Sequence, residues 1–189
     1  MPDDEGAALY RTGRRAASVG PLLEIGSYCG KSSVYLGAAA RAGGSVLFSI
    51  DHHRGSEEHQ AGEEYFDPRL VDDQGRVDTL PQFRKTIDEA GLWDTVIAVI
   101  GTSTTVARHW AIPLGLVFVD GGHSRSAAHS DFENWSRHVM VGGYLAIHDV
   151  FSDPQEGGRP PFEIYERAID GGGFAEVATA GSLRVLQRI

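Results

Sequence analysis

Short apolar runs alternate along the chain with segments in which apolar residues recur at helical spacing. This alternation predicts a doubly wound, mostly parallel α/β sheet, and strands that are apolar throughout are typical of a sheet covered on both faces. We expect strands at residues 21–25, 45–50, 96–100, 114–119, 144–147, 174–179 and 183–187. We expect helices at residues 7–18, 32–42, 79–90, 106–110, 126–139 and 162–169.

The last two expected strands are separated only by a turn at residues 180–182, so they predict an antiparallel hairpin at the end of a Rossmann-like sheet. The length of 189 residues suits one domain, residues 1–189. Residues 52–78 are polar with little apolar periodicity, and a loop this long in a small domain is usually functional. We therefore expect residues 52–78 to form a substrate or lid loop.

Polar residues stand where four of the expected strands end. Glu24, Asp51 and Asp120 each close one strand, and the pair His148 and Asp149 closes a fourth. In open α/β sheets the ligand crevice lies outside the carboxyl ends of the strands. These side chains are therefore expected along one edge of the sheet, around a binding site.

The segment from Glu24 to Gly30 joins the first strand to a helix and carries two glycines. A P-loop has four residues between its first glycine and the Gly-Lys-Ser sequence, whereas three residues separate Gly26 from Gly30. A dinucleotide-binding fingerprint needs glycine at position 28, which is Tyr28 here. The spacing instead resembles the first motif of class I methyltransferases, although a purely structural strand-to-helix turn stays open as the alternative.

That resemblance implies a class I methyltransferase fold that binds S-adenosylmethionine at this edge. Asp51 lies about twenty residues beyond the glycines, where an acidic side chain can hold both ribose hydroxyls. The segment that follows the third strand is where this fold usually brackets the adenine. The predicted donor-binding residues are Glu24, Gly26, Ser27, Tyr28, Gly30, Ser32, Asp51, His52, Gly101, Thr102, Ser103 and Asp120.

A second constellation concerns the methyl acceptor. The ends of neighbouring strands can bring Asp120, His148 and Asp149 together, and two carboxylates with an imidazole form a donor set for a divalent metal ion. His123 follows Asp120 closely and is the predicted catalytic base, taking the proton of a substrate hydroxyl. Hydrogen-bonded strand ends without a metal ion are the structural alternative.

Together with the glycine motif, these residues resemble the macrocin O-methyltransferase-like group over nearly the whole chain. The resemblance implies a metal-dependent enzyme that methylates sugar hydroxyls, with magnesium bound by Asp120 and Asp149, and a homodimer. His148 departs from the carboxylate usual at its position, and imidazole suits manganese or another transition metal better than magnesium. Within the group the chain is most similar to mycobacterial enzymes that act on 4-linked oligomannosides.

Composition and charge limit the classes of partner that we expect. A net charge of -9 argues against nucleic acid, and we expect no membrane span because no apolar run is long enough. The only cysteine, Cys29, fits a reducing cytoplasm. His53 and Tyr65, in the polar loop, are candidate contacts to a small-molecule or oligosaccharide substrate. The alternatives are methylation of a catechol-like molecule, an NAD-dependent oxidoreductase on a similar sheet, and a non-catalytic module that binds S-adenosylmethionine.

Overall fold

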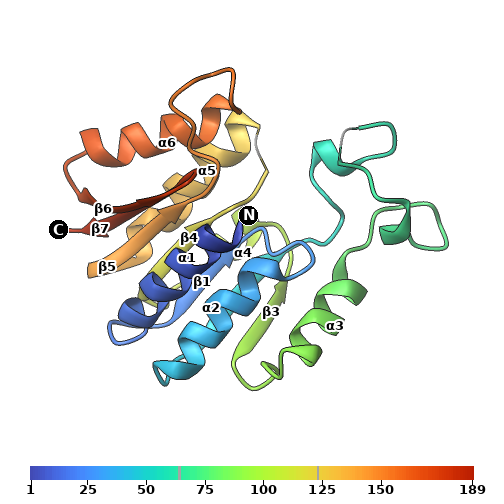
Figure 1. Ribbon diagram of the computed structural model, residues 1–189, viewed down its shortest axis with the longest axis horizontal. Helices are drawn as coiled ribbons and strands as arrows, with labels where there is room; N and C mark the ends of the chain where they lie inside the picture. The colour runs from blue at the N-terminus through green and yellow to red at the C-terminus, as the bar shows by residue number, and fades with distance from the viewer. Residues whose placement is uncertain (64, 123) are drawn as a thin grey trace.

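A computed structural model describes residues 1–63, 65–122 and 124–189. In this part of the chain a seven-stranded sheet has the order β3-β2-β1-β4-β5-β7-β6 (Figure 1). Strands β1 to β5 pair in parallel, whereas β7 lies antiparallel between β5 and β6. The expected mostly parallel sheet with an antiparallel C-terminal hairpin is therefore confirmed. The strands are β1 (Leu22–Ile25), β2 (Leu47–Asp51), β3 (Val96–Ile100), β4 (Leu114–Val119), β5 (Val139–Ile147), β6 (Phe174–Ala180) and β7 (Leu183–Arg188).

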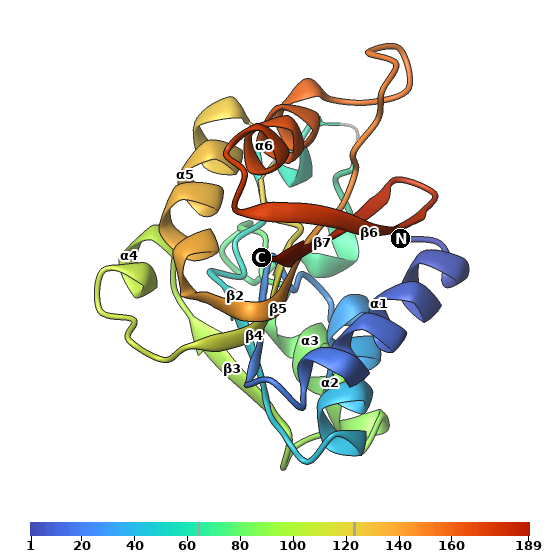
Figure 2. The same cartoon turned by 90° about the vertical axis from the view of Figure 1, so that its left-hand side faces the viewer.

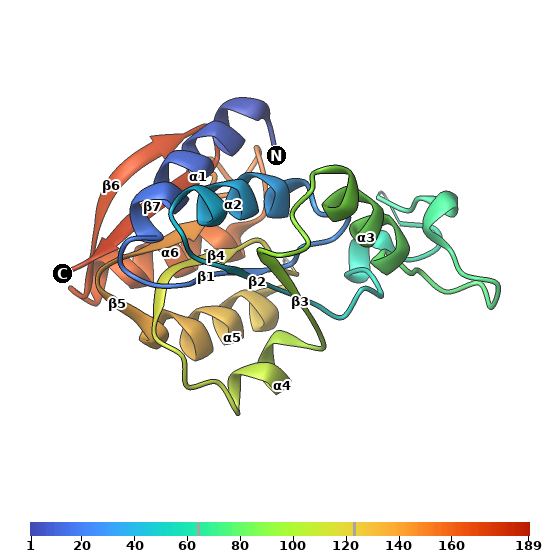
Figure 3. The ribbon, with the colours of Figure 1, turned by 90° about the horizontal axis from the view of Figure 1, so that it is seen from below.

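Helices cover both faces of the sheet, with α1, α2 and α3 on one side and α4, α5 and α6 on the other (Figure 3). The α-helices are α1 (Asp3–Ala16), α2 (Lys31–Ala42), α3 (Leu80–Glu89), α4 (Ser103–Ala107), α5 (Arg125–Trp135) and α6 (Arg159–Asp170). Short 3-10 helices are η1 (Glu57–His59), η2 (Pro68–Leu70) and η3 (Ser136–His138).

Alternation along β1 assigns its side chains to the two faces. Leu22 packs in the core beneath α1 and α2 with Leu36, whereas Leu23 and Ile25 pack in the core beneath α5 and α6. Side chains of a strand point to opposite faces in turn, so Glu24 is directed toward α2 together with Leu22. This geometry decides where the Glu24 carboxylate ends up.

Several expected boundaries are wrong, and two of them have a clear local reason. Strand β5 begins at Val139, not at residue 144, because the chain stays in the sheet through Gly142 and Gly143. Gly142 adopts a φ of +80°, and the register with β4 shifts near Gly115, which is how a β-bulge accommodates glycine within a strand. The short helix α4 begins at Ser103, not at residue 106, since the Thr102 side chain caps it by accepting from the Thr105 backbone N–H.

The polar segment between β2 and α3 extends away from the sheet on the side of α3 (Figure 1). It contains η1, η2 and an isolated antiparallel bridge between Val71 and Val77. At the opposite edge, the start of α1 lies next to the turn between β6 and β7 (Figure 2). Among the described residues, no helix has both the length and the apolar character needed to cross a bilayer.

Candidate active site

A cavity of about 630 Å³ opens at the carboxyl ends of β1, β2, β3 and β4. This is the edge where the sequence predicts a ligand, and the volume lies in the range typical of small-molecule and cofactor sites. Of the predicted donor-binding residues, those that line it are Gly26, Tyr28, Asp51, His52, Gly101, Thr102, Ser103 and Asp120.

The glycine loop after β1 is shaped by close backbone contacts. Gly26 has a φ of +88° and Gly30 a φ of +91°, a region that favours glycine. A Cβ on Gly26 would overlap the carbonyl oxygen of Asp120, so only glycine lets the loop approach the end of β4 this closely. The loop therefore brings cavity walls from two neighbouring strands together.

Asp51 ties the same loop to the end of β2. Its Oδ2 accepts from the Tyr28 backbone N–H at 2.8 Å, and its Oδ1 accepts from the His53 backbone N–H at 2.7 Å. A carboxylate has about four acceptor positions, so both oxygens can accept further bonds from a ligand. Asp51 also lines the cavity, in the position expected for a ribose contact.

The predicted donor-binding role of Glu24 requires its side chain to line this cavity. It does not line it. The side chain is fully buried under α2, where Oε1 accepts from Ser33 Oγ and from Ser49 Oγ. Burial raises the pKa of Glu24 to about 7, although the serine hydroxyls oppose this shift. Strand alternation, which points Glu24 toward α2, explains the difference, and Ser33 was not foreseen as its partner.

Three other predicted donor residues also lie behind the cavity wall. Ser27 and Ser32 are buried, and neither is part of the lining. Gly30 is the N-cap of α2 and faces Phe83 and Thr86 of α3 instead of the cavity. Ser27, Ser32 and Gly30 therefore support the loop that carries Gly26 and Tyr28 and do not line the cavity themselves.

Two walls of the cavity were missed by the sequence reasoning. The helix η1 contributes Glu57, Glu58 and His59, and the His59 ring stacks on Tyr28 with centroids 4.6 Å apart. Asp131 of α5 forms the other wall and accepts from Ser103 Oγ. Burial raises the pKa of Asp131 to about 6, partly offset by this hydrogen bond.

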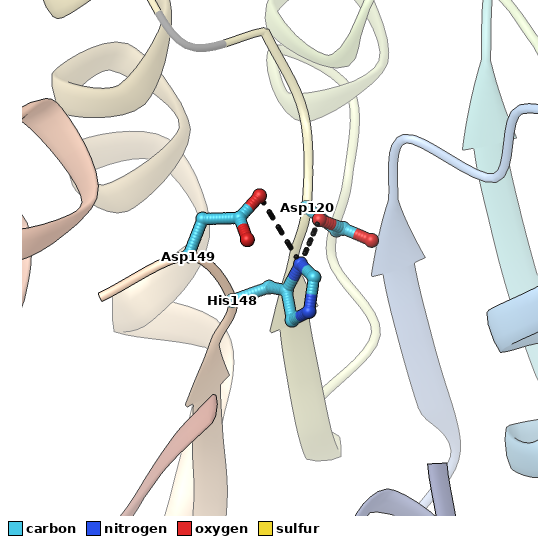
Figure 4. Close-up of side chains that lie close together, drawn as sticks. All are labelled: Asp120, His148 and Asp149. Carbon is cyan, nitrogen blue, oxygen red and sulfur yellow. Dashed lines mark hydrogen bonds and ion pairs between the residues drawn. The ribbon is translucent and has the colours of Figure 1, made fainter. Parts of the chain in front are cut away.

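The second constellation lies at the ends of β4 and β5 (Figure 4). His148 Nδ1 is 2.9 Å from Asp120 Oδ1 and 3.3 Å from Asp149 Oδ2. One donor atom from each of the three residues lies within 4.8 Å of the others. The structure thus brings together the three residues predicted as metal ligands.

These three residues contribute to the walls of two cavities. Asp120 lines the first cavity, whereas His148 and Asp149 line a second one of about 460 Å³. The walls of the second cavity come from the start of the chain, the segment after β5 and the β6–β7 turn.

The other ring nitrogen of His148 is engaged as well. Nε2 is 2.8 Å from Oε2 of Glu5, a buried residue of α1. Burial lowers the pKa of His148, but its bonds to Asp120 and Asp149 outweigh burial and raise the pKa to about 11. Without a metal ion the ring is therefore an imidazolium held among three carboxylates.

The three residues fit a divalent metal ion. Two carboxylates and an imidazole nitrogen converge, and the second ring nitrogen faces a carboxylate, as is usual for metal-bound histidine. Binding would require the Nδ1 proton to leave, because a metal ligand must be deprotonated. Imidazole in the set favours Mn²⁺ or another transition metal over Mg²⁺.

The remaining predicted residues take other positions. His53 is 2 % exposed, and its Nδ1 lies 2.8 Å from Thr79 Oγ1, so it does not reach the first cavity as a substrate contact. Tyr65 is 56 % exposed and also lies outside the lining, with its ring 6.3 Å from that of His59. The predicted base His123 lies outside the described residues.

Three non-glycine residues of the described chain have positive φ: Tyr28, His53 and Asp149. Each follows the carboxyl end of a strand, namely β1, β2 and β5. Such backbone conformations cost about 1–3 kcal/mol each and cluster at functional sites. Their placement agrees with a binding site at this edge.

The fold is similar to that of solved methyltransferases. Cofactor-bound Rv0187 from MTB superposes with a TM-score of 0.69 at 15% identity, covering 100% of this chain and 81% of that chain. The O-methyltransferase NovP superposes with a TM-score of 0.70 at 16% identity, covering 98% of this chain and 79% of that chain. The methyltransferase PaMTH1 of Podospora anserina, bound to SAH, superposes with a TM-score of 0.67 at 13% identity, covering 100% of this chain and 82% of that chain. At these identities the likeness concerns the fold.

A family model described as a methyltransferase domain matches residues 23–150. The match begins in β1 and ends just after β5, so it includes the glycine loop, Asp51 and all three residues of the metal-type cluster. It decides against the NAD-dependent oxidoreductase considered from the sequence. With more than half of its length matched, the chain belongs to the methyltransferase domain family.

Proposed function

We propose that this protein transfers a methyl group from S-adenosylmethionine to a hydroxyl of a sugar or oligosaccharide, with a divalent metal ion at Asp120, His148 and Asp149. The observation that carries the proposal is that Asp120 lines the first cavity, whereas His148 and Asp149, which contact each other and Asp120 through the His148 ring, line the second. A donor in the first cavity and an acceptor in the second would meet there. The oligomannoside named by the sequence resemblance is our first acceptor to test.

The first cavity supports the donor half of the proposal. Asp51 lies in its wall with acceptor capacity for the ribose hydroxyls, and Gly26 lines it where the glycine loop packs against the backbone of Asp120. Behind the loop, two buried polar atoms have no hydrogen-bond partner in the described chain, Glu24 Oε2 and Ser27 Oγ. Both are available to the zwitterionic end of the donor if the loop adjusts on binding.

The second cavity supports the acceptor half. Phe151 offers an apolar wall, and Glu156 and Arg184 offer polar groups. A site that combines a ring surface with a few hydrogen-bonding groups suits a sugar. Because the acidic cluster forms the common boundary, a hydroxyl that enters from this side would reach the donor methyl near Asp120.

The chemistry needs a base. The hydroxyl oxygen forms a bond to the methyl carbon, the carbon–sulfur bond breaks with its electron pair left on sulfur, and the hydroxyl proton departs. We assign that proton to His123, because its sequence neighbours Gly122 and Ser124 both line the first cavity. A bound divalent ion would supply a lower pKa for a coordinated hydroxyl. The chain's contribution is to hold both partners in line and to keep water away.

An acceptor screen with labelled methyl donor tests the proposal. Mannose oligomers, simple sugars and a catechol would be compared, and S-adenosylhomocysteine and NAD titrated in parallel by calorimetry. Label on the sugars is the expected result. Label on the catechol alone would replace the acceptor class, and S-adenosylhomocysteine binding without any transfer would point to a non-catalytic module. Binding of NAD but not of S-adenosylhomocysteine would overturn the proposal.

The metal requirement is tested separately. After treatment with EDTA, methyl transfer should be lost and should return with Mn²⁺ or Mg²⁺, whereas Asp120→Asn should not recover. Full activity without metal would leave Asp120, His148 and Asp149 as hydrogen-bonded strand ends. A cytoplasmic setting and a homodimer are further expectations of this proposal.

A further inference from the structure

Glu5 is a buried acid far in sequence from the cluster that it contacts. It lies in the first turn of α1 and is 2 % exposed, on the same buried stripe as Leu9, Thr12 and Ala16. An acidic side chain at such a position loses hydration and must find partners inside the protein. Glu5 finds them on two other elements, the end of β5 and the β6–β7 turn.

Both oxygens of Glu5 are used. Oε2 lies 2.8 Å from His148 Nε2. Oε1 accepts from the backbone N–H of Ser182 at 2.6 Å and from Ser182 Oγ at 2.9 Å. Oε1 thus accepts two hydrogen bonds and Oε2 faces a ring nitrogen that can donate, so the geometry suits a carboxylate, which only accepts hydrogen bonds.

This arrangement fixes the proton on one side of the His148 ring. Since Glu5 accepts at Nε2, that nitrogen carries a hydrogen. Nδ1 is the nitrogen that faces Asp120 and Asp149, at 2.9 and 3.3 Å. A neutral ring held by Glu5 thus has its lone pair on Nδ1, directed at the two carboxylates.

We infer that Glu5 is a positioning residue for the metal site, which holds His148 in the tautomer and orientation that make Nδ1 a ligand. The inference rests on the metal ion of the proposed function. It gives α1 a role that the family match, which begins at residue 23, does not include. It also explains why the start of α1 lies beside the β6–β7 turn, since Glu5 joins α1 to Ser182 next to the cluster.

Glu5→Gln is the sharpest variant. The amide keeps the size of the side chain and keeps Oε1 for Ser182, but it presents an N–H₂ group to Nε2 of His148. Nε2 must then accept, so the ring proton moves to Nδ1 and blocks the ligand position. Carboxylates that orient metal-bound histidines typically contribute 10- to 100-fold to metal affinity, so we expect a loss of about that size.

Thr12→Val is the matched control. It changes a buried polar side chain on the same stripe of α1 and removes one hydrogen bond to the Ala8 carbonyl, away from the cluster. Mn²⁺ alone would be titrated into wild type and both variants and followed by electron paramagnetic resonance, with thermal unfolding as the check on folding. Weaker Mn²⁺ binding in Glu5→Gln, with Thr12→Val close to wild type, is the expected result.

The outcomes separate the two proposals. If wild type binds no Mn²⁺, the metal site of the proposed function fails and this inference with it. If wild type binds Mn²⁺ and folded Glu5→Gln binds it equally well, the inference alone is overturned. Should Glu5→Gln not fold, nitrogen NMR of wild type with Mg²⁺ decides, since the inference requires the His148 proton on Nε2, and a proton on Nδ1 contradicts it.

Discussion

Gly26 and Asp120 touch through their backbones, so that a Cβ on Gly26 would overlap the Asp120 carbonyl oxygen. The contact joins the loop after β1 to the end of β4, the two neighbouring central strands. Asp120 belongs both to the first cavity and to the acidic cluster. The spacing of the glycine loop therefore controls the donor side and the acceptor side of the site together.

Gly26→Ala should abolish donor binding and destabilise the fold. The variant combines a positive φ with a clash against rigid backbone, and the chain must shift at the cavity wall. Gly44→Ala is the matched control, since Gly44 has a φ of +72° but open space around it, and should cost only the strain of about 1–3 kcal/mol. Calorimetry with S-adenosylhomocysteine and thermal unfolding would be measured. Equal effects of the two variants would show that the contact with Asp120 does not matter.

Asp51→Asn should weaken S-adenosylhomocysteine binding by about 10- to 100-fold, the size of one lost hydrogen bond to a charged group. The amide keeps one acceptor but turns an N–H₂ group toward the N–H of Tyr28 or His53, which the carboxylate now holds. Asp88→Asn, on the exposed side of α3, is the control. Unchanged affinity in Asp51→Asn would remove Asp51 from the donor site.

The meeting of Asp51, Asp120, His148 and Asp149 follows from the sequence, because parallel strands in a doubly wound sheet place their carboxyl ends at one edge. The face toward which Glu24 points could also have been predicted, since alternation pairs it with Leu22 beneath α2. Glu24 was assigned to the ligand only because it belongs to the glycine motif.

Other features depend on contacts that no local pattern encodes. Glu5 reaches His148 across 143 positions of sequence and Ser182 across 177. In the sequence, the only sign of this role is that Glu5 is an acidic residue on the apolar stripe of a helix. The wall at Glu57 to His59 depends on the path of a polar loop, and His53 turns away from the cavity through a φ of +56°. Turn-level conformations of this kind are set by the packed structure.

His123→Ala should lower the turnover number by about 10²- to 10⁴-fold, the usual contribution of a general base, and leave S-adenosylhomocysteine affinity nearly unchanged. The reason is that a base acts on the acceptor hydroxyl and not on the donor. His109→Ala, an exposed histidine beyond α4, is the control for loss of any imidazole. Retained turnover in His123→Ala would exclude it as the base.

Glu24 should make stability depend on pH. Burial raises its folded pKa to about 7 from 4.5, so the folded state favours the protonated acid. The contribution of protonated Glu24 to the free energy of unfolding is fully present below about pH 4.5. It is lost as the pH rises through 7, by an amount on the order of 3 kcal/mol. Glu24→Gln keeps the shape and cannot ionise, so it should be less affected over this range.

The measurement is the free energy of unfolding by urea for wild type and Glu24→Gln between pH 4.5 and 8. Other groups titrate in both proteins, and the difference between the two isolates Glu24. Wild type should lose stability relative to the variant as the pH rises, because neutral serine hydroxyls, among them those of Ser33 and Ser49, offset the burial of an ionised Glu24 only in part. A difference that stays constant with pH would show that burial does not raise the pKa of Glu24. Bound S-adenosylhomocysteine should reduce the dependence if the donor's ammonium group approaches Glu24 Oε2.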